Sequence, residues 1–154
     1  MKISVIAVGR LKERYWREAA DEYIKRLRPH ATLEVIEVPD RDVTRDEVRA
    51  VAEEGADVLR AIPDGAHVIA LDIGGIQRSS TDIADRLGAL GLEGRSAVAF
   101  VVGGAAGLSS EVIARADERL SLGRITLPHQ LARVVLLEQL YRAFKIMHNE
   151  PYHR

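Results

Sequence analysis

The sequence predicts an α/β protein with a mostly parallel sheet and helices on both faces of that sheet. Segments rich in apolar and β-branched residues alternate along the chain with segments whose apolar residues recur at helical spacing. The apolar segments are continuous, which is typical of strands that are buried on both faces. With 154 residues the chain can build one sizeable core, so residues 1–154 are expected to form a single domain.

The first half of the chain is expected to contain three strands and two helices. Strands are expected over residues 2–8, which form a β-branched and apolar run, and over residues 33–38 and 67–71. The first helix is expected over residues 13–27, where apolar residues recur at helical spacing. Thr44 and Glu47 fit a capping box, so a second helix is expected to begin there and run to about Ala61. The Gly74-Gly75 pair after the third strand is expected to form a loop.

The second half is expected to contain two strands and three helices. Ser79 or Ser80 is expected to cap a helix that ends near residue 90, and Ser109 or Ser110 a short helix that ends at residue 116. Strands are expected over residues 97–102 and, more briefly, 119–122. Pro128 suits the first turn of the longest helix, which is expected to run to about residue 147.

The apolar residues of this longest helix spread over roughly 180° of its surface, wider than the ~100° stripe of a helix that packs on one core. They are Val134, Leu136, Leu137, Leu140, Tyr141, Ala143, Phe144 and Met147. Such a helix needs two apolar partners. Either the second partner is the same helix of another subunit, or the helix is buried inside a monomer.

Composition excludes several classes of site. The chain has no cysteine, so it has no disulfide and no thiolate nucleophile or metal ligand. No apolar run approaches the ~20 residues that cross a bilayer, and the first apolar run is too short for a signal peptide, so a cytoplasmic location is expected.

The net charge of −1 conceals a basic start and a basic end. Residues 1–30 carry 8 basic and 4 acidic residues, residues 31–123 carry 9 and 17, and residues 124–154 carry 5 and 2. If the two ends meet in the fold, they can form a local basic patch that binds phosphates. Solvated charge clusters that arose by chance explain the counts equally well.

Ligands of parallel sheets bind beyond the carboxyl ends of the strands. Three loops are expected there, at residues 72–77, 103–108 and 123–129. The middle loop, in the sequence VVGGAAGLSS, is rich in glycine and leads into a helix, but its spacing is G-G-x-x-G and it lacks a Walker lysine. A phosphate loop and a tight turn without a ligand therefore remain alternatives.

The histidines do not predict a metal site, because no two are spaced as H-x-x-x-H on one helix face. The chain ends in Tyr152, His153 and Arg154, whose aromatic, imidazole and guanidinium groups can stack on a base and contact a phosphate. No nucleophile elbow or hydrolase carboxylate pair is present. The residues alone thus indicate an α/β domain that binds a nucleotide-like ligand.

Five stretches carry a resemblance that covers essentially the whole chain in order. They read MKISVIAVGRLKERYW, VIALDIGG, FVVGGAAGLS, LSLGRITLPHQLARVVLLEQLYRAFKI and NEPYHR. Together they resemble the RlmH (YbeA) family of SPOUT-class methyltransferases, which methylate N3 of a pseudouridine in large-subunit ribosomal RNA. The resemblance implies a minimal SPOUT domain with a C-terminal trefoil knot, which physical reasoning would not propose because knots are nearly absent from proteins.

The resemblance also implies a homodimer packed through the C-terminal helix, with S-adenosylmethionine as cofactor. Its pocket would be lined by Leu71, Gly103, Leu122, Gly123, Arg124, Ile125, Thr126 and Leu127. Glycine at position 103 would leave room for the ligand. No metal is implied.

Methyl transfer mainly requires alignment of the attacking nitrogen, and its imide proton must leave. We expect His153 to act as the base or to orient the nucleotide, and Tyr152 and Arg154 to place it. Arg142 would contact phosphate or stabilise the anion, although an exposed arginine or a dimer salt bridge is an equal alternative. We expect a shared site, in which one subunit holds the cofactor and its partner supplies the tail.

With so little net charge, the protein should prefer ribosomal RNA in the assembled ribosome to naked RNA. Two other classes of function stay open. The glycine loop fits a nucleotide-dependent oxidoreductase, and the basic ends fit a non-catalytic ribosome-binding module.

Overall fold

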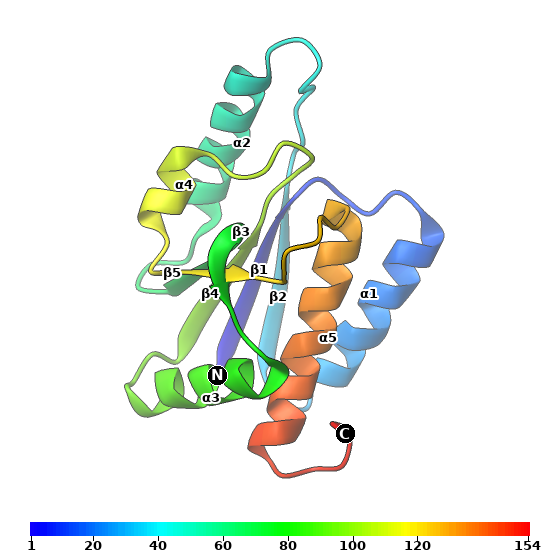
Figure 1. Cartoon of the computed structure of the whole chain (residues 1–154), viewed down its shortest axis with the longest axis vertical. Helices are drawn as coiled ribbons and strands as arrows, with labels where there is room; N and C mark the ends of the chain where they lie inside the picture. Colours follow the sequence, from blue (N-terminus) through cyan, green and yellow to red (C-terminus); the bar gives the residue numbers. More distant parts are fainter.

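The computed structural model describes residues 1–154 and contains a five-stranded sheet in the order β2-β1-β4-β3-β5. All neighbouring strands are parallel. The strands are β1 (Lys2–Val8), β2 (Thr32–Val38), β3 (His67–Gln77), β4 (Ala97–Val102) and β5 (Glu118–Ser121). The helices are α1 (Arg14–Leu27), α2 (Glu47–Ala61), α3 (Ser80–Leu92), α4 (Ser110–Arg115) and α5 (His129–Met147). The predicted fold class, a parallel sheet between helices, is confirmed (Figure 1).

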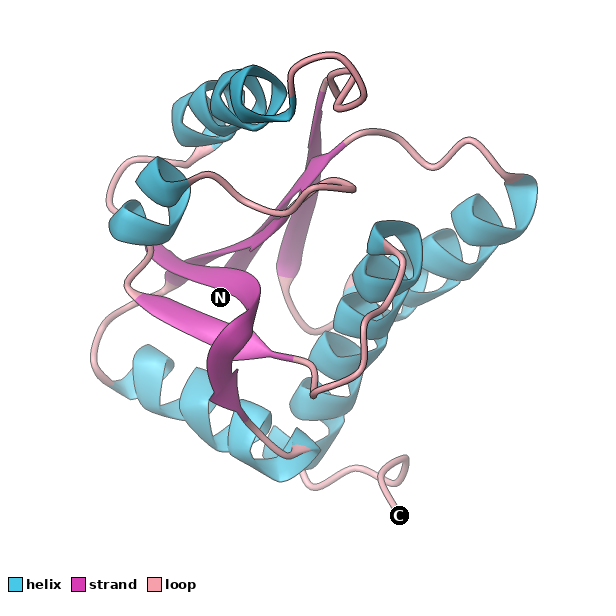
Figure 2. Ribbon diagram, turned by 45° about the horizontal axis from the view of Figure 1, so that its top comes forward, coloured by secondary structure: helices cyan, strands magenta, loops and turns pink.

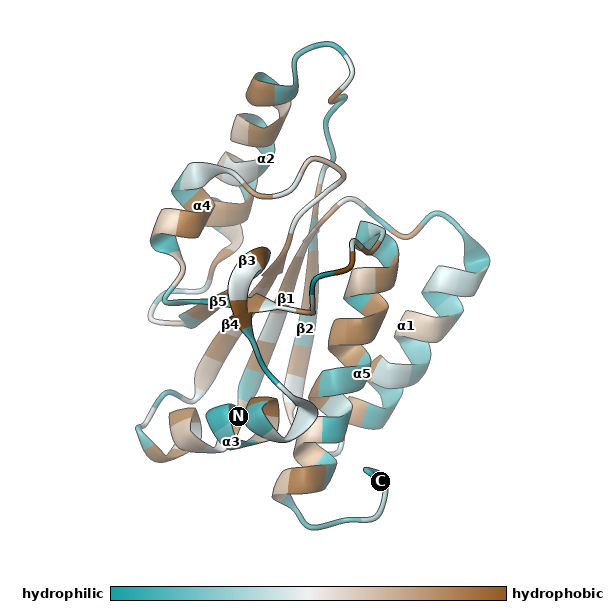
Figure 3. Ribbon diagram, in the orientation of Figure 1, coloured by the Kyte–Doolittle hydropathy of each residue, from teal (hydrophilic) through white to brown (hydrophobic).

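Two apolar cores lie on opposite faces of the sheet (Figure 2). The helices α1, α3 and α5 cover one face, while α2 and α4 cover the other. Successive residues of β1 alternate between them: Ile3 and Val5 enter the first core, Ile6 and Val8 the second. This double burial explains the continuous apolar runs, because both sides of a strand need apolar side chains. Figure 3 shows hydrophobic stretches along the strands and bands of hydrophobic and hydrophilic residues along the helices.

The predicted start of α2 is wrong by two residues. Its N-cap is Asp46, whose side chain accepts a hydrogen bond from the backbone N–H of Arg49. Thr44 instead donates its backbone N–H and its hydroxyl to Asp42 Oδ1, at 2.9 and 2.6 Å. Threonine and aspartate side chains readily form such local hydrogen bonds. Thr44 is therefore part of the turn before the helix and does not cap it. The serine cap predicted for α3 is confirmed, because Ser79 and Asp82 form a capping box.

Strand β3 is longer than the sequence predicts, and the expected loop at Gly74-Gly75 is part of it. The strand pairs with β5 twice: Leu71 lies opposite Leu120, and after an irregularity Ile76 also lies opposite Leu120. A Cβ atom at Gly75 would lie 2.6 Å from the backbone carbon of Arg119 and 2.7 Å from its oxygen. Glycine at position 75 therefore allows the backbones of β3 and β5 to pass close to each other. The knot implied by the resemblance remains a prediction.

Helix α5 finds both of its apolar partners within the chain. It packs between α1 and α3, and Leu136, Leu137 and Leu140 are each at most 1 % exposed in the first core. The other apolar residues of the 180° arc join the same core. The arc therefore has apolar partners within the chain, but Val134, Tyr141 and Met147 stay only partly buried, so packing against a second subunit remains a prediction. No helix of the structure combines the length and the apolar character that crossing a bilayer requires.

The amino-terminal side of β5 is held by a buried ion cluster. Glu118 contacts His67 Nε2 at 2.5 Å and Arg86 Nε at 2.9 Å, and lies 3.5 Å from Arg78 Nη2. Burial alone would raise the pKa of Glu118, but the hydrogen bonds and charges of Arg86 and His67 hold that pKa below its ordinary value. The cluster therefore fixes β5 to β3 and α3 with an ionised carboxylate.

Candidate active site

A cleft of about 340 Å³ lies at the carboxyl edge of the sheet, where the sequence predicts a ligand site. It is bounded by the second half of β3, by the β4–α4 loop, and by the β5–α5 loop together with the first turn of α5. Ten of its 17 lining residues are hydrophobic, so the walls suit a ligand with large apolar parts.

The structure brings together seven of the eight residues expected to bind the cofactor. The cleft is lined by Leu71, Gly103, Leu122, Gly123, Ile125, Thr126 and Leu127. Arg124 is the exception, because it is exposed and does not line the cleft. Three loops that are distant in sequence thus converge because β3, β4 and β5 are neighbours in the sheet.

The glycine loop of residues 103–107 folds back on itself. The N–H of Gly107 donates to the carbonyl oxygen of Gly104 at 3.1 Å, and Gly107 has a φ of +84°, which favours glycine. A Cβ atom at Gly103 would lie 2.9 Å from the carbonyl carbon of Gly107. Glycine is therefore needed at position 103 because the loop's own backbone passes so close. Gly103, Gly104 and Gly107 also line the cleft.

The β5–α5 loop begins with a turn that needs glycine. Gly123 has a φ of +121°, in a region that other residues rarely adopt. Ser121, which is 2 % exposed, accepts a hydrogen bond from the N–H of Gly123 and donates its hydroxyl to the carbonyl oxygen of Gly123. This local network directs residues 124–127 away from the sheet and along the cleft.

Sequence reasoning placed Asp72 and His129 within the expected ligand loops but gave neither a role, and both line the cleft. Burial, together with the positive charge of Arg133, lowers the pKa of His129 below its ordinary value. The imidazole is therefore neutral near pH 7 and does not repel a cationic ligand. Asp72 accepts a hydrogen bond from Arg119 Nη1 at 3.0 Å, which neutralises its charge. The places of Asp72 and His129 in the predicted loops at residues 72–77 and 123–129 were the only signal.

A buried carboxyl group supports the glycine loop from below. Glu54 is 3 % exposed, and its Oε2 accepts the backbone N–H of Arg41 at 2.7 Å, while its Oε1 has no hydrogen-bond partner. A Cβ atom at Gly104 would lie 3.5 Å from this Oε1. Burial raises the pKa of Glu54 above its ordinary value.

The tail residues expected to act in catalysis gather at the other end of α5. Arg142 is held by Glu138, with Nε and Nη2 at 2.8 and 2.5 Å from Oε1. The Arg142 guanidinium lies 4.7 Å from the centre of the Tyr152 ring, and its Nη1 lies 3.2 Å from Nδ1 of His153. Burial and the nearby Glu138 raise the pKa of Tyr152. Arg154 is exposed at the end of the chain.

This arrangement defines which tautomer a neutral His153 ring adopts. Arginine only donates hydrogen bonds, so Nδ1 of His153 must accept, and a neutral ring then carries its proton on Nε2. In this position Nδ1 is occupied by Arg142 and is not open to a substrate. A role as base therefore requires the tail to leave Arg142.

The cleft and the tail cluster lie far apart along α5 (Figure 1). His129 lines the cleft, and Arg142 follows 13 residues later, so the two are separated by roughly 20 Å along the helix axis. From the helix end at His148, five further residues reach His153, and a fully extended chain of that length spans at most about 18 Å. The distance back to His129 is roughly 28 Å. The tail thus cannot reach that side of its own cleft while α5 stays intact.

Two histidines meet beside the tail, although the sequence spacing predicted no metal site. Nδ1 of His30 lies 3.3 Å from Nδ1 of His148, and Glu150 Oε1 lies 3.7 Å from the latter. The other carboxylate oxygen of Glu150 pairs with Lys145 Nζ at 2.6 Å. A lysine at this distance opposes the binding of a further cation. The contact between His30 and His148 also brings together the basic first and last segments of the chain, as the charge pattern of the sequence allows.

Comparison with solved structures shows which class of fold this is. A probable methylase family protein from Haemophilus influenzae aligns with a TM-score of 0.58 at 14% identity, over 99% of this chain and 70% of that chain. TrmJ from Z. mobilis aligns with a TM-score of 0.56 at 15% identity, over 100% and 73%. The chain therefore shares the α/β fold of these proteins.

Sequence comparison then identifies the family. The family described as "Predicted SPOUT methyltransferase" matches residues 1–153, and the chain belongs to it. Proteins called "Ribosomal RNA large subunit methyltransferase H" from Bacillus cereus and Bacillus cytotoxicus are 52% and 50% identical to this chain. Both alignments cover 100% of this chain and 100% of the relative. The resemblance stated from the motifs is thereby confirmed.

Proposed function

We propose that this protein is an S-adenosylmethionine-dependent methyltransferase that methylates N3 of a pseudouridine in 23S ribosomal RNA. The observation that carries the proposal is a full-length identity of about half with proteins called ribosomal RNA large subunit methyltransferase H. The convergence of seven expected cofactor residues around one cleft supports it independently.

The cleft fits the cofactor in size and chemistry. Its volume of about 340 Å³ falls in the range of small-ligand sites, and its walls are largely apolar. Leu122, Ile125 and Leu127 would contact the adenine and the aliphatic chain. His129 is neutral and Asp72 is paired with Arg119, so neither opposes a positively charged ligand. S-adenosylmethionine would supply an activated methyl group on its positively charged sulfur.

The tail would handle the nucleotide and its proton. Once His153 leaves Arg142, its imidazole can accept the imide proton of the base directly or orient the base through a hydrogen bond. Tyr152 would stack on the nucleotide and Arg154 would contact a phosphate. Arg142, released from His153, would stabilise the negative charge that develops on the base.

We infer that the active species is a homodimer with shared sites, since the tail is too short to reach the side of its own cleft that His129 lines. A two-fold interface places the tail of each subunit against the cleft of the other. Exposed apolar side chains beside the cleft support this: Ile73, Ile76 and Ile125 are 61, 57 and 72 % exposed. Such side chains gathered on one side favour burial by a second copy.

The preferred substrate is the assembled ribosome. The net charge of −1 gives little general attraction to RNA, so affinity must come from shape and from a few local contacts. Binding of the ribosome without methyl transfer would instead describe a non-catalytic module.

Cofactor binding tests the proposal against the oxidoreductase alternative. A ligand that binds only the folded protein stabilises it, so S-adenosylmethionine at about 100 times its Kd should add roughly 2.7 kcal/mol of stability. NAD at equal concentration should leave the melting temperature unchanged. Stabilisation by NAD alone would contradict the assignment of the cleft.

A further inference from the structure

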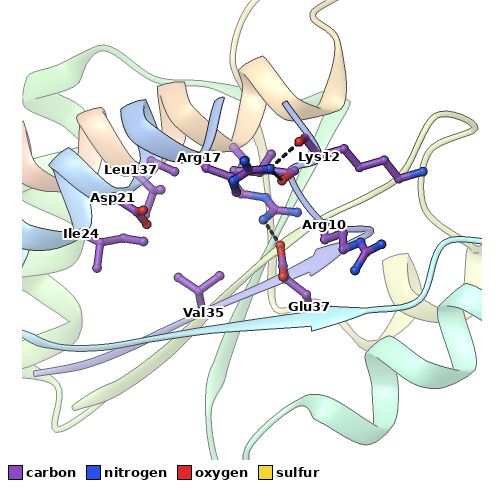
Figure 4. A pocket seen from close by; sticks show the side chains of 11 residues that line it. Arg10, Lys12, Arg17, Asp21, Ile24, Val35, Glu37 and Leu137 are labelled. Atoms are coloured by element: carbon purple, nitrogen blue, oxygen red, sulfur yellow. Dashed lines mark hydrogen bonds and ion pairs between the residues drawn. The ribbon is translucent and has the colours of Figure 1, made fainter. Parts of the chain in front are cut away.

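A second cavity, of about 680 Å³, lies on the other side of α5 and has twice the volume of the cleft. It opens between the β1–α1 loop, α1, β2 and α5 (Figure 4). Its charged lining consists of Arg10, Lys12, Arg17, Arg133, Asp21 and Glu37. The four cations exceed the two carboxylates, so the cavity has an excess of two positive charges.

Two of the four cations hold the β1–α1 loop, Arg133 from the buried side and Arg17 from the exposed side. Arg133 is only 3 % exposed; its Nη1 donates to Glu37 Oε2 at 2.5 Å and its Nη2 to the carbonyl oxygen of Gly9 at 2.7 Å. Arg17 donates to the carbonyl oxygens of Leu11 and Lys12. Both arginines are therefore occupied by the β1–α1 loop, and together they fix its backbone.

The fixed loop presents the other two cations at the rim. Arg10 and Lys12 are exposed, and neither forms an ion pair with any carboxylate of the chain. Figure 4 shows both side chains extending away from Asp21 and Ile24. Glu37, a carboxylate of the cavity, is already neutralised by Arg133. Two cations on a rigid loop are thus left without an anionic partner.

The position of this rim relates it to the cleft. The β1–α1 loop follows the carboxyl end of β1, at the same edge of the sheet as the cleft. Arg133 lines the cavity and its neighbour Ala132 lines the cleft, so the first turns of α5 separate the two. Arg124, also exposed and without an ion pair, lies in the β5–α5 loop at the same edge.

We propose that Arg10 and Lys12, at the rim of this cavity, bind backbone phosphates of the RNA strand that carries the target nucleotide. The occupant is a phosphodiester chain because the rim offers cations in excess, an open cavity and no aromatic ring on which a base could stack. This inference rests on the proposed function and extends it to substrate binding. It explains how a protein of net charge −1 holds RNA through a few local contacts.

The test compares two double variants that remove the same charges. Arg10→Ala with Lys12→Ala removes the rim. Arg95→Ala with Lys2→Ala removes one arginine and one lysine that are also exposed and unpaired but lie at the opposite, amino edge of the sheet. Dissociation constants for ribosomes lacking the modification are measured over a range of salt concentrations, with methyl transfer measured in parallel.

The rim variant should bind ribosomes about tenfold more weakly, and its salt dependence should fall by roughly 0.7 to 0.9 per lost phosphate contact. Its KM for ribosomes should rise by a similar factor, while its kcat and its affinity for S-adenosylmethionine stay at the wild-type values. The amino-edge variant should match the wild type in every measurement.

Equal ribosome affinities and salt slopes for the two double variants would overturn the inference. The binding measurement does not depend on catalysis. A wild-type protein that binds ribosomes through Arg10 and Lys12 but transfers no methyl group would therefore refute the proposed function and leave this surface established.

Discussion

Replacing Gly75 by alanine will destabilise the protein by about 3 kcal/mol, near the upper end of the usual cost of overpacking. The added Cβ atom would lie 2.6 and 2.7 Å from the backbone carbon and oxygen of Arg119, and 2.9 Å from the nitrogen of Leu120. Backbone atoms of β5 cannot rotate away as a side chain can. Strands β3 and β5 must therefore separate, and both form walls of the cleft, so cofactor affinity should also fall.

The neighbouring glycine provides a matched control. A Cβ atom at Gly74 would meet only the ends of two side chains, Asp72 Oδ2 at 3.6 Å and Arg119 Nη1 at 3.8 Å. Gly74→Ala should therefore keep its stability and cofactor affinity close to the wild type. Denaturant unfolding and calorimetric titration with S-adenosylmethionine measure both quantities. Equal stabilities for the two alanine variants would show that β3 and β5 do not cross as closely as described.

Removing the imidazole of His153 will lower kcat by about 100-fold or more, as expected when a group that moves a proton is lost. Affinity for S-adenosylmethionine should not change, because His153 lies outside the cleft. His148→Ala is the matched control, since His148 is also a histidine near the tail but has no role in the proposed reaction. An undiminished kcat for His153→Ala would remove this residue from the mechanism.

Mixed dimers test whether the tail acts on the partner's cleft. Gly123→Val should abolish cofactor binding, because valine does not adopt a φ of +121°. A purified heterodimer of Gly123→Val with His153→Ala has one site with an intact cleft and an intact tail if sites are shared. It should regain about half of the wild-type activity, since a two-fold dimer has two sites. A heterodimer as inactive as both parents would show that each tail serves its own cleft.

The order of strands and helices could be predicted from the sequence because each of them has a local cause. Residues 3–8 are apolar except for Ser4 since both faces of this strand are buried, and Ser79 with Asp82 caps α3 through neighbouring residues. The run of residues 97–102 was likewise recognisable before any partner strand was known.

The second half of β3 could not be predicted, because its cause lies in another strand. Gly74 and Gly75 look like a turn to any local rule, whereas Gly75 is small so that β5 can pass close by. The same limit applies to α5, whose wide apolar arc suggested a second subunit as one alternative. The arc is filled by α1 and α3, which only the fold brings to its two sides.

The candidate site, too, could be predicted only in part. Residues 122–127 could be assigned through the family resemblance, and all of them except Arg124 line the cleft together with Leu71 and Gly103. His129 and Asp72 lie in the predicted loops but were given no role, because residue type and spacing alone did not single them out. The pairing of His30 with His148 joins residues 118 positions apart, which no spacing rule could detect.

The central claim is methyl transfer to ribosomal RNA, and the most direct test is transfer of labelled methyl from S-adenosylmethionine to ribosomes that lack the modification. The labelled nucleotide is then mapped. We expect label on N3 of one pseudouridine of the large-subunit RNA, with intact ribosomes labelled far faster than free RNA. Ribosomes that bind the protein and its cofactor yet acquire no label would contradict the assignment.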